Sequence, residues 1–183
     1  IISFNGGPGT ASVWMHLGFT GPRHVTYDDD GFQQKPPAGL EDNPHAILDV
    51  ADIVYLDPIG TGFSRMVEGE DLHKFHGKLS DIQSVGDFIH TYVNRKDRWT
   101  SPKFLIGESY GGHYVPSLAN VIMNKNEGSP DPLNFYGLMV GNPLTDAKLE
   151  MFKLIDLWWN RVIISTNVCD EIKRTCDAET ILS

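Results

Sequence analysis

The chain has 183 residues, of which 40% are hydrophobic and 21% are charged, and its formal net charge at pH 7 is −9. This length is sufficient for one domain with a sizeable core. The acidic balance and the lack of a dense Lys/Arg segment exclude nucleic acid as an expected partner. No apolar run approaches the roughly 18 residues that a membrane-spanning helix needs, so we expect no membrane span.

The first half of the chain predicts two buried strands and one helix. Residues 1–4 and 52–57 are nearly continuous apolar runs, as expected for strands that are covered on both faces. Residues 27–44, which are rich in Asp, Gly and Pro, and residues 68–77 predict exposed connections. Apolar residues then recur at spacings of three and four over residues 80–98, which indicates a helix with one buried face.

The second half continues this alternation. Buried strands are predicted over residues 103–107 and 135–141, and helices over residues 109–124 and 147–159. Pro116 should kink the helix that contains it or mark an irregular turn. Strands that alternate with helices in this way predict an α/β fold, in which a mostly parallel central sheet is flanked by helices.

One segment carries the pattern of a catalytic serine. Residues 107–111 read Gly-Glu-Ser-Tyr-Gly and match G-x-S-x-G, at the point where a predicted buried strand passes into a predicted helix. A nucleophile elbow requires this setting. The flanking glycines permit a cramped turn that exposes the hydroxyl of Ser109, and the helix N-terminus favours developing negative charge. The alternative is a Gly-Ser turn at a helix cap, without chemistry.

A serine nucleophile also needs two donors for the oxyanion. The backbone N–H of Tyr110, directly after Ser109, is one candidate. The second is expected from a glycine-rich loop after an earlier strand, and residues 5–9, Asn-Gly-Gly-Pro-Gly, follow the first predicted strand. Alone this segment is typical of an ordinary tight turn, but together with the elbow it predicts an oxyanion loop.

Four segments together resemble the serine carboxypeptidase family. The chain has Asn-Gly-Gly-Pro-Gly at 5–9, Asp-Pro-Ile-Gly-Thr-Gly-Phe-Ser at 57–64, Gly-Glu-Ser-Tyr-Gly-Gly at 107–112 and Gly-Asn-Pro-Leu-Thr-Asp at 141–146. The family's usual forms are N-G-G-P-G-C-S-S, D-x-P-x-G-T-G-[YF]-S, G-E-S-Y-G-G and G-N-G-x-T-D, in the same order. The resemblance spans most of the chain and implies the α/β-hydrolase fold.

By matching position, the resemblance implies a serine-type carboxypeptidase, a hydrolase that releases C-terminal amino acids from peptides through an acyl-enzyme. Ser109 would attack the scissile carbonyl, and the N–H groups of Gly7 and Tyr110 would hold the oxyanion. The expected partner is a peptide with a free C-terminus, and no metal or organic cofactor is expected. Family membership also implies a secreted, periplasmic, vacuolar or lysosomal location.

The resemblance further implies that Asn5, Gly6 and Glu108 bind the C-terminal carboxylate of the substrate. A carboxyl group can hydrogen-bond a carboxylate only when one of the two is protonated, so the pair should share a proton. Tighter peptide binding at mildly acidic pH follows from this arrangement. The alternative is that Glu108 is a structural carboxylate that supports the site without contacting the substrate.

The sequence departs from the family pattern at three places. Thr10 and Ala11 stand where many members have Cys-Ser, so a disulfide common there is absent. Phe19 falls where some members have a glutamate that joins the carboxylate-binding network, which bears on strict carboxypeptidase recognition. Pro143 replaces a glycine in a loop.

The acid and base that would complete a catalytic triad are not found. In α/β-hydrolases the order is Ser, Asp, His, and the only histidine after Ser109 is His113, which lies four residues along the same predicted helix. We therefore expect a partial sequence that lacks the later strands of the sheet and is inactive alone. Residues 1–160 would form the N-terminal part of the hydrolase domain, and residues 161–183 would begin a lid or insertion.

Two other functions remain open. A serine carboxypeptidase-like acyltransferase or esterase would use the same elbow, and Phe19 slightly favours that reading. A non-catalytic scaffold would keep the fold alone, but a strained turn around Ser109 has no use there.

Two residue pairs have less specific interpretations. Cys169 and Cys176 could form a local disulfide, could each pair elsewhere, or could be free thiols. His73 and His76 have the spacing of half a metal site, but no cluster of ligands supports one, and we expect a solvated loop.

Overall fold

The structure, a computed structural model, describes residues 1–32, 37, 39–75 and 77–176. Its centre is a four-stranded parallel sheet with the strand order β4-β1-β5-β6. The strands are β1 (Ile2–Phe4), β4 (Val54–Tyr55), β5 (Lys103–Glu108) and β6 (Phe135–Gly141). All four predicted strands are present, although β4 occupies only the centre of the predicted run at 52–57. The prediction that they are covered on both faces is wrong for β6, which has no buried residue and exposes Tyr136, Leu138 and Met139.

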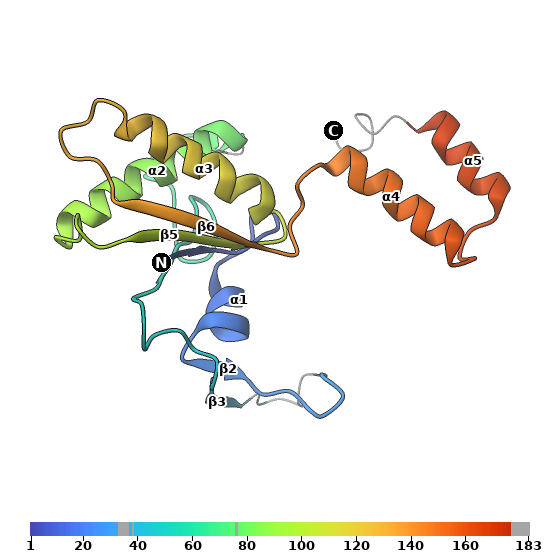
Figure 1. Ribbon diagram of the computed structural model, residues 1–183, viewed down its shortest axis with the longest axis horizontal. Coiled ribbons are helices and arrows are strands. Elements are labelled where there is room, and N and C mark those ends of the chain that lie inside the picture. Colours follow the sequence, from blue (N-terminus) through green and yellow to red (C-terminus); the bar gives the residue numbers. More distant parts are fainter. Residues whose placement is uncertain (33–36, 38, 76, 177–183) are drawn as a thin grey trace. The chain divides into compact units, whose positions relative to one another are not determined.

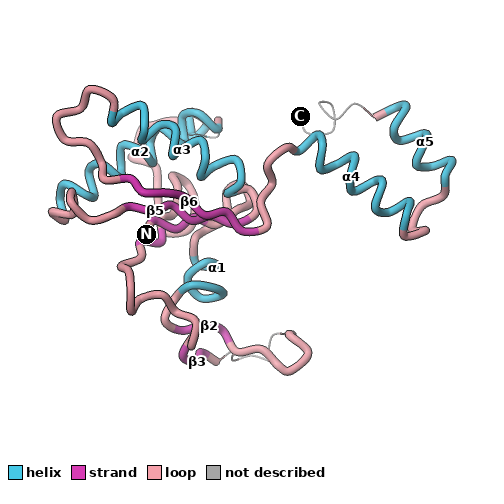
Figure 2. The backbone as a smooth tube through the Cα atoms, viewed as in Figure 1, coloured by secondary structure: helices cyan, strands magenta, loops and turns pink. Residues whose placement is uncertain are grey.

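Two helices cover one face of this sheet, as Figures 1 and 2 show: α2 (Lys78–Arg95) and α3 (Gly111–Asn126) pack against each other, and α3 packs on β5 and β6. Both helices were predicted, and together with the parallel sheet they confirm the α/β fold. Pro116 lies inside α3, which continues through it. Since proline has no N–H, the hydrogen bond to the preceding turn is missing there.

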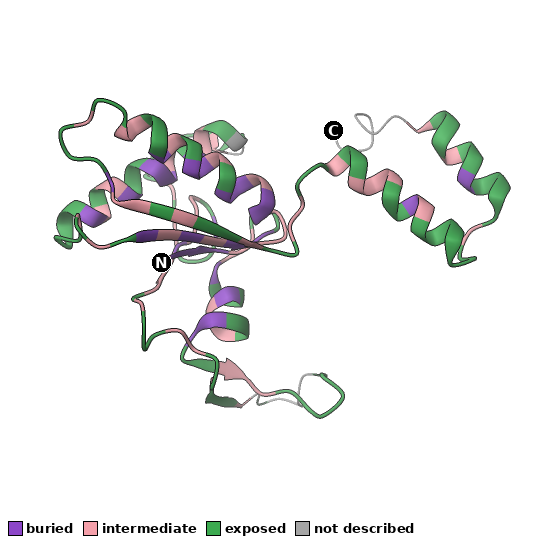
Figure 3. Cartoon of the chain, in the orientation of Figure 1, coloured by how far each residue is buried: buried purple, intermediate pink, exposed green. Residues whose placement is uncertain are grey.

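The core lies between the sheet and these two helices, where the buried faces meet (Figure 3). Ile82, Val85, Ile89 and Val93 form the buried stripe of α2 that the spacing predicts, whereas Phe88, an apolar residue in the same pattern, is 42% exposed. The core residues are Ile2, Phe4, Leu56, Ile82, Val85, Ile89, Val93, Leu105, Tyr114, Val115, Leu118, Ala119, Ile122 and Leu133.

Several short elements were not predicted. α1 (Val13–Met15) continues into a π-helical turn (His16–Thr20), and a single 3-10 turn (Leu72–Phe75) precedes α2. β2 (Arg23–Val25) and β3 (Leu40–Asp42) form an antiparallel pair, and β3 falls within the stretch predicted as an exposed connection. These elements are three to five residues long, which is too short for a period to show in the sequence.

The chain divides into two compact units, residues 1–143 and 144–183. In the second unit, α4 (Ala147–Asn160) was predicted, whereas α5 (Thr166–Thr175) was not. The side chains of Asp146 and Ser165 cap these helices by accepting hydrogen bonds from the N–H groups of Leu149 and Val168. The predicted boundary after residue 160 therefore falls between α4 and α5, inside the second unit.

That a lid begins at residue 161 remains a proposal, and residues 177–183 lie outside the described residues. Cys169 is buried in α5, and neither Cys169 nor Cys176 is in a disulfide in the structure. Among the described residues, no helix has both the length and the apolar character needed to cross a membrane.

Candidate active site

The turn between β5 and α3 holds Ser109 in an unusual backbone conformation. Ser109 has φ +56°, in the left-handed region that residues with a side chain adopt at a cost. Its N–H donates to the carbonyl of Gly141 at 3.0 Å, and its own carbonyl accepts from the N–H of Gly112 at 2.9 Å. Strand, strained serine and helix therefore follow one another in the order that a nucleophile elbow requires.

The glycine-rich loop after β1 lies directly against this turn. A Cβ atom on Gly6 would lie 2.7 Å from both the carbonyl oxygen of Glu108 and the Cβ of Ser109, and 2.9 Å from the nitrogen of Tyr110. Only glycine permits so close an approach of the two backbones. Gly7, at φ +118°, then turns the loop away. The structure thus brings the predicted oxyanion loop and the predicted nucleophile into contact.

Asp57 fixes the far side of that loop, a role that the sequence analysis did not assign. One oxygen of its carboxylate accepts a hydrogen bond from the N–H of Ser12 at 2.7 Å, and the other accepts from the N–H of Phe63 at 2.9 Å. The hydroxyl of Ser64 donates to the backbone carbonyl of Asp57 at 2.7 Å. An Asp at the start of a glycine-rich loop was the available signal, since such side chains often bond nearby backbone N–H groups.

Ser12 links Asp57 to the oxyanion loop, because it is hydrogen-bonded to both Asp57 and Asn5. It is 1% exposed, and its hydroxyl donates to the carbonyl of Leu56 at 2.5 Å while it accepts from the N–H of Asn5 at 3.4 Å. Asn5, Ser12 and Asp57 therefore form one connected network between the ends of β1 and β4. A buried network of this kind restricts its members to one arrangement.

Two cavities adjoin the oxyanion loop, and Asn5 lines both. The first, which we name the Glu108 cavity, has a volume of about 600 Å³. Glu108 is its only carboxylate among the described residues, and the large side chains of Trp14 and Phe19 face it, 66% and 64% exposed. Its lining is Asn5, Trp14, Met15, Gly18, Phe19, Tyr27, Ile106, Gly107, Glu108, Met139, Val140, Gly141 and Asn142.

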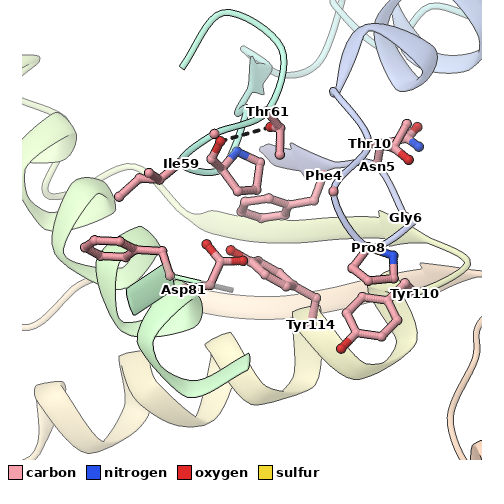
Figure 4. Close-up of a pocket in the computed structure, with 14 residues that line it drawn as sticks. Phe4, Asn5, Gly6, Pro8, Thr10, Ile59, Thr61, Asp81, Tyr110 and Tyr114 are labelled. Atoms are coloured by element: carbon pink, nitrogen blue, oxygen red, sulfur yellow. Dashed lines mark hydrogen bonds between the residues drawn. The ribbon is translucent and has the colours of Figure 1, made fainter. Parts of the chain in front are cut away.

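The second, the Asp81 cavity, has a volume of about 280 Å³ and lies between the oxyanion loop and the first turns of α2 and α3 (Figure 4). Burial raises the pKa of Asp81 to about 6, against a smaller opposing effect of the Tyr114 hydroxyl. Burial, and then the nearby charge of Asp81, raise the pKa of Tyr114. Its lining is Phe4, Asn5, Gly6, Pro8, Gly9, Thr10, Pro58, Ile59, Gly60, Thr61, Phe75, Asp81, Tyr110 and Tyr114.

Comparison with known proteins decides the family. The chain matches the serine carboxypeptidase family over residues 1–182. It belongs to that family. It is 33% identical to serine carboxypeptidase-like 25 of Arabidopsis thaliana over 180 residues, which are 97% of this chain and 36% of that protein. It is 31% identical to serine carboxypeptidase-like 26 of Oryza sativa subsp. japonica over 182 residues, again 97% of this chain and 36% of the relative.

A solved structure agrees with this assignment. The crystal structure of Kex1(delta)p, a prohormone-processing carboxypeptidase from Saccharomyces cerevisiae, superposes with a TM-score of 0.69 at 26% sequence identity. The match covers 96% of this chain and 40% of the yeast chain. This serine carboxypeptidase chain thus spans well under half the length of the relatives it matches.

The structure distributes the predicted carboxylate-binding residues of this family member over two cavities. Glu108 lines the Glu108 cavity, Gly6 lines the Asp81 cavity and contacts the elbow with its backbone, and Asn5 lines both cavities. Phe19, the departure from the family pattern, lies in the Glu108 cavity. Thr10, where many members have a cysteine, lines the Asp81 cavity.

The structure gives His113 no position across from Ser109. It lies in the first turn of α3, next to Tyr110, with 5.6 Å between the two ring centroids. Among the described residues, no group of three or more His, Cys, Asp or Glu side chains could hold a metal ion. His73 is exposed, and its predicted companion His76 lies outside the described residues.

Proposed function

We propose that this chain supplies the nucleophile and the oxyanion site of a serine-type carboxypeptidase, in which Ser109 forms the acyl-enzyme. The observation that carries the proposal is the backbone of Ser109, held at φ +56° between β5 and α3 with Gly6 against it. A residue with a side chain persists in this conformation only where its surroundings impose it, and such strain clusters at functional sites. Since the chain spans 36% of its Arabidopsis relative, the activity of the whole protein is part of the proposal.

The chemistry assigned to these residues is acyl transfer. The oxygen of Ser109 attacks the scissile carbonyl carbon, and its proton passes to a general base that we do not assign within this chain. The N–H groups of Gly7 and Tyr110 donate to the oxyanion of the tetrahedral intermediate. The C–N bond then breaks, the protonated amine of the C-terminal residue leaves, and water hydrolyses the ester on Ser109.

Exopeptidase specificity would come from Asn5, Gly6 and Glu108. Asn5 and Glu108 line one cavity beside the elbow, where the free carboxylate of a peptide can meet an amide and a protonated carboxyl group. Two carboxyl groups at hydrogen-bond distance must share one proton. Peptide binding should therefore be tighter at mildly acidic pH than at neutral pH.

The test uses the polypeptide as its organism produces it. Release of the terminal amino acid from an N-blocked dipeptide is followed at mildly acidic pH, beside the same peptide with an amidated C-terminus. Rapid cleavage of the free acid and sparing of the amide are expected. Equal cleavage of both would contradict the carboxylate-binding role, and cleavage of neither would contradict the peptidase assignment.

One observation favours a second candidate function, acyl transfer or ester hydrolysis. The Glu108 cavity presents the apolar side chains of Phe19 and Trp14, both largely exposed, to any leaving group. Large aromatic surface suits an apolar alcohol as well as an amino acid. Turnover of simple esters or activated acyl donors, without release of amino acids from the dipeptide, would support this alternative.

A further inference from the structure

The two oxyanion donors assigned above belong to separate segments of the chain. The N–H of Gly7 lies in the loop that follows β1, whereas the N–H of Tyr110 lies directly before the first residue of α3. Strand pairing sets β1 against β5, with Phe4 opposite Gly107, but it does not hold α3. An oxyanion is stabilised only when both donors are within hydrogen-bond distance of one point. The position of the first turn of α3 relative to the end of β1 therefore matters for catalysis.

Tyr114 connects these two segments. It lies one turn after Tyr110 in α3, and its N–H donates to the carbonyl of Tyr110 at 3.2 Å. Tyr114 is 7% exposed, and its ring lies against the ring of Phe4, the last residue of β1, with 5.2 Å between the ring centroids. Phe4 is itself buried and directly precedes Asn5, where the oxyanion loop begins. One side chain thus joins the start of α3 to the residue before the loop.

The Tyr114 hydroxyl extends this connection to α2. It shares a hydrogen bond with the side chain of Asp81, which lies in the first turn of α2. Figure 4 shows the two side chains pointing toward each other in the Asp81 cavity. A hydrogen bond to an ionised carboxylate is roughly twice as strong as one between neutral groups. A partly buried carboxylate also loses solvation, which a neutral side chain of the same shape would avoid, so packing alone does not account for an acid here.

We propose that Asp81 and Tyr114 are positioning residues of the oxyanion site: they hold the first turn of α3 against the end of β1, so that the two donor N–H groups meet one oxyanion. This inference rests on the proposed function, because the oxyanion forms only when Ser109 attacks a carbonyl. Neither side chain needs to touch the reacting atoms to do so. Loss of the hydrogen bond between them should therefore weaken binding of the transition state and leave binding of the ground state unchanged.

Two inhibitors separate these two kinds of binding. N-blocked phenylalaninal can form a tetrahedral adduct with Ser109 that carries an oxyanion, whereas N-blocked phenylalaninol cannot. Both inhibition constants are measured at pH 7.5 on the polypeptide as its organism produces it, beside kcat and KM for an N-blocked dipeptide. Tyr114→Phe keeps the ring against Phe4 and removes only the hydroxyl. We expect it to lower kcat and the affinity for the aldehyde about tenfold each, less than the 10²–10³ that loss of a whole donor costs, with KM and alcohol binding unchanged.

Asp81→Asn is the second variant and keeps the hydrogen bond in a weaker, neutral form. Here kcat and aldehyde affinity should fall about threefold. The double variant should lose no more than Tyr114→Phe alone, because both changes act on one hydrogen bond. Tyr136→Phe, which removes an exposed hydroxyl on β6, is the matched control and should change none of these quantities. If Tyr114→Phe does not fold, Asp81→Asn alone decides between the outcomes.

Loss of folded protein cannot imitate the expected result, because unfolded molecules lower the apparent kcat without changing an inhibition constant. Unchanged aldehyde affinity in the two variants, or equal weakening of the aldehyde and the alcohol, would overturn the positioning role and leave the peptidase standing. A wild type that neither cleaves the dipeptide nor binds the aldehyde more tightly than the alcohol would contradict the proposed function itself, and the positioning role with it.

Discussion

Two cavities meet at Asn5, and each contains one carboxyl side chain, but different kinds of structure build them. The Asp81 cavity is walled by the loops at residues 5–10 and 58–61 and by the core side chains of Phe4 and Tyr114, and its acid lies partly buried among them. The Glu108 cavity is walled by the ends of β5 and β6 and by the irregular segment around α1, where Trp14 and Phe19 are exposed.

The two cavities nevertheless share one feature, the tight backbone contact between Gly6 and the elbow. Gly6 touches the elbow, so the walls of both cavities depend on the same few atoms. Asp81, in the Asp81 cavity, loses part of its solvation, and its charged form is then stable only with a partner. The acid in the Glu108 cavity is half-buried and lies where a substrate carboxylate can reach it. The following predictions test this division of roles.

The largest effect is expected from Gly6→Ala, which acts on the shared wall. The added Cβ would lie 2.7 Å from Ser109 Cβ and from the Glu108 carbonyl, so the oxyanion loop must move away. Loss of one oxyanion donor costs about 10²–10³ in kcat. Gly137→Ala in β6, where an added Cβ would lie at an ordinary 3.8 Å from the Phe104 side chain, is the control and should retain activity. Equal kcat values for the two variants would contradict the role of the loop contact.

A smaller effect is expected from Asp57→Asn, which weakens the support of the loop. The amide group cannot accept from both Ser12 and Phe63, so one N–H loses its hydrogen bond at a cost of about 1–3 kcal/mol. We expect a kcat lowered about tenfold with little change in KM. Asp28→Asn is the control, because Asp28 accepts two backbone hydrogen bonds at a single oxygen in an exposed turn, and an amide oxygen can keep both. A loss of stability without any loss of kcat would reduce Asp57 to a structural role.

Glu108→Gln should change substrate binding in the Glu108 cavity only. Glutamine can donate to a substrate carboxylate at every pH, whereas glutamate can do so only when the pair holds a proton. The KM of a free-acid peptide should therefore rise about tenfold from pH 5 to pH 7.5 in wild type and stay nearly flat in the variant. If the variant kept the pH dependence of wild type, Glu108 would not be the group that shares a proton with the substrate carboxylate.

The smallest effect is expected from Asp81→Asn, which removes the cost of burying the Asp81 carboxylate. Because burial raises the pKa of Asp81 from 3.8 to about 6, folding favours the protonated form, and stability falls as the pH rises through this range. Solvent screens a partly exposed group, so we expect a cost of about 1 kcal/mol, or roughly 2–4 °C in Tm. Asp81→Asn should melt higher than wild type at pH 7.5 and at the same temperature at pH 4.

Glu70→Gln provides the control of opposite sign for that measurement. A hydrogen bond from Lys74 lowers the pKa of the exposed Glu70, so its contribution is present at neutral pH and lost as the pH falls. This variant should not gain stability at pH 7.5. If Asp81→Asn also showed no gain there, the carboxylate of Asp81 would already be compensated within the protein.

The sequence was most informative where a long pattern coincides with packing. The buried stripe of α2 predicted that helix within a few residues, because the packed face sets its period. The apolar run of β6 predicted the bounds of that strand but not its burial, because the strand has no buried residue. The elbow was predicted from the G-x-S-x-G motif together with its position. Gly107 and Gly111 indicate an elbow only because they lie between a strand and a helix.

The parts that escaped prediction depend on contacts between distant segments. The hydrogen bonds that Asp57 accepts from Ser12 and Phe63 join two loops, and Ser12 and Asp57 are 45 positions apart in the sequence. Asp81 belongs to the cavity because α2 lies beside α3, which no local pattern shows. The three-residue strands β2 and β3 carry no period, so composition alone suggested a connection there.

The central claim is that the turn at residue 109 presents a reactive serine. The polypeptide as its organism produces it is treated with a fluorophosphonate, digested and analysed by mass spectrometry, beside Ser109→Ala. The account predicts one adduct, on Ser109, that forms in wild type and is absent from the variant. An adduct on another serine, or none under conditions in which the protein is folded, would contradict it.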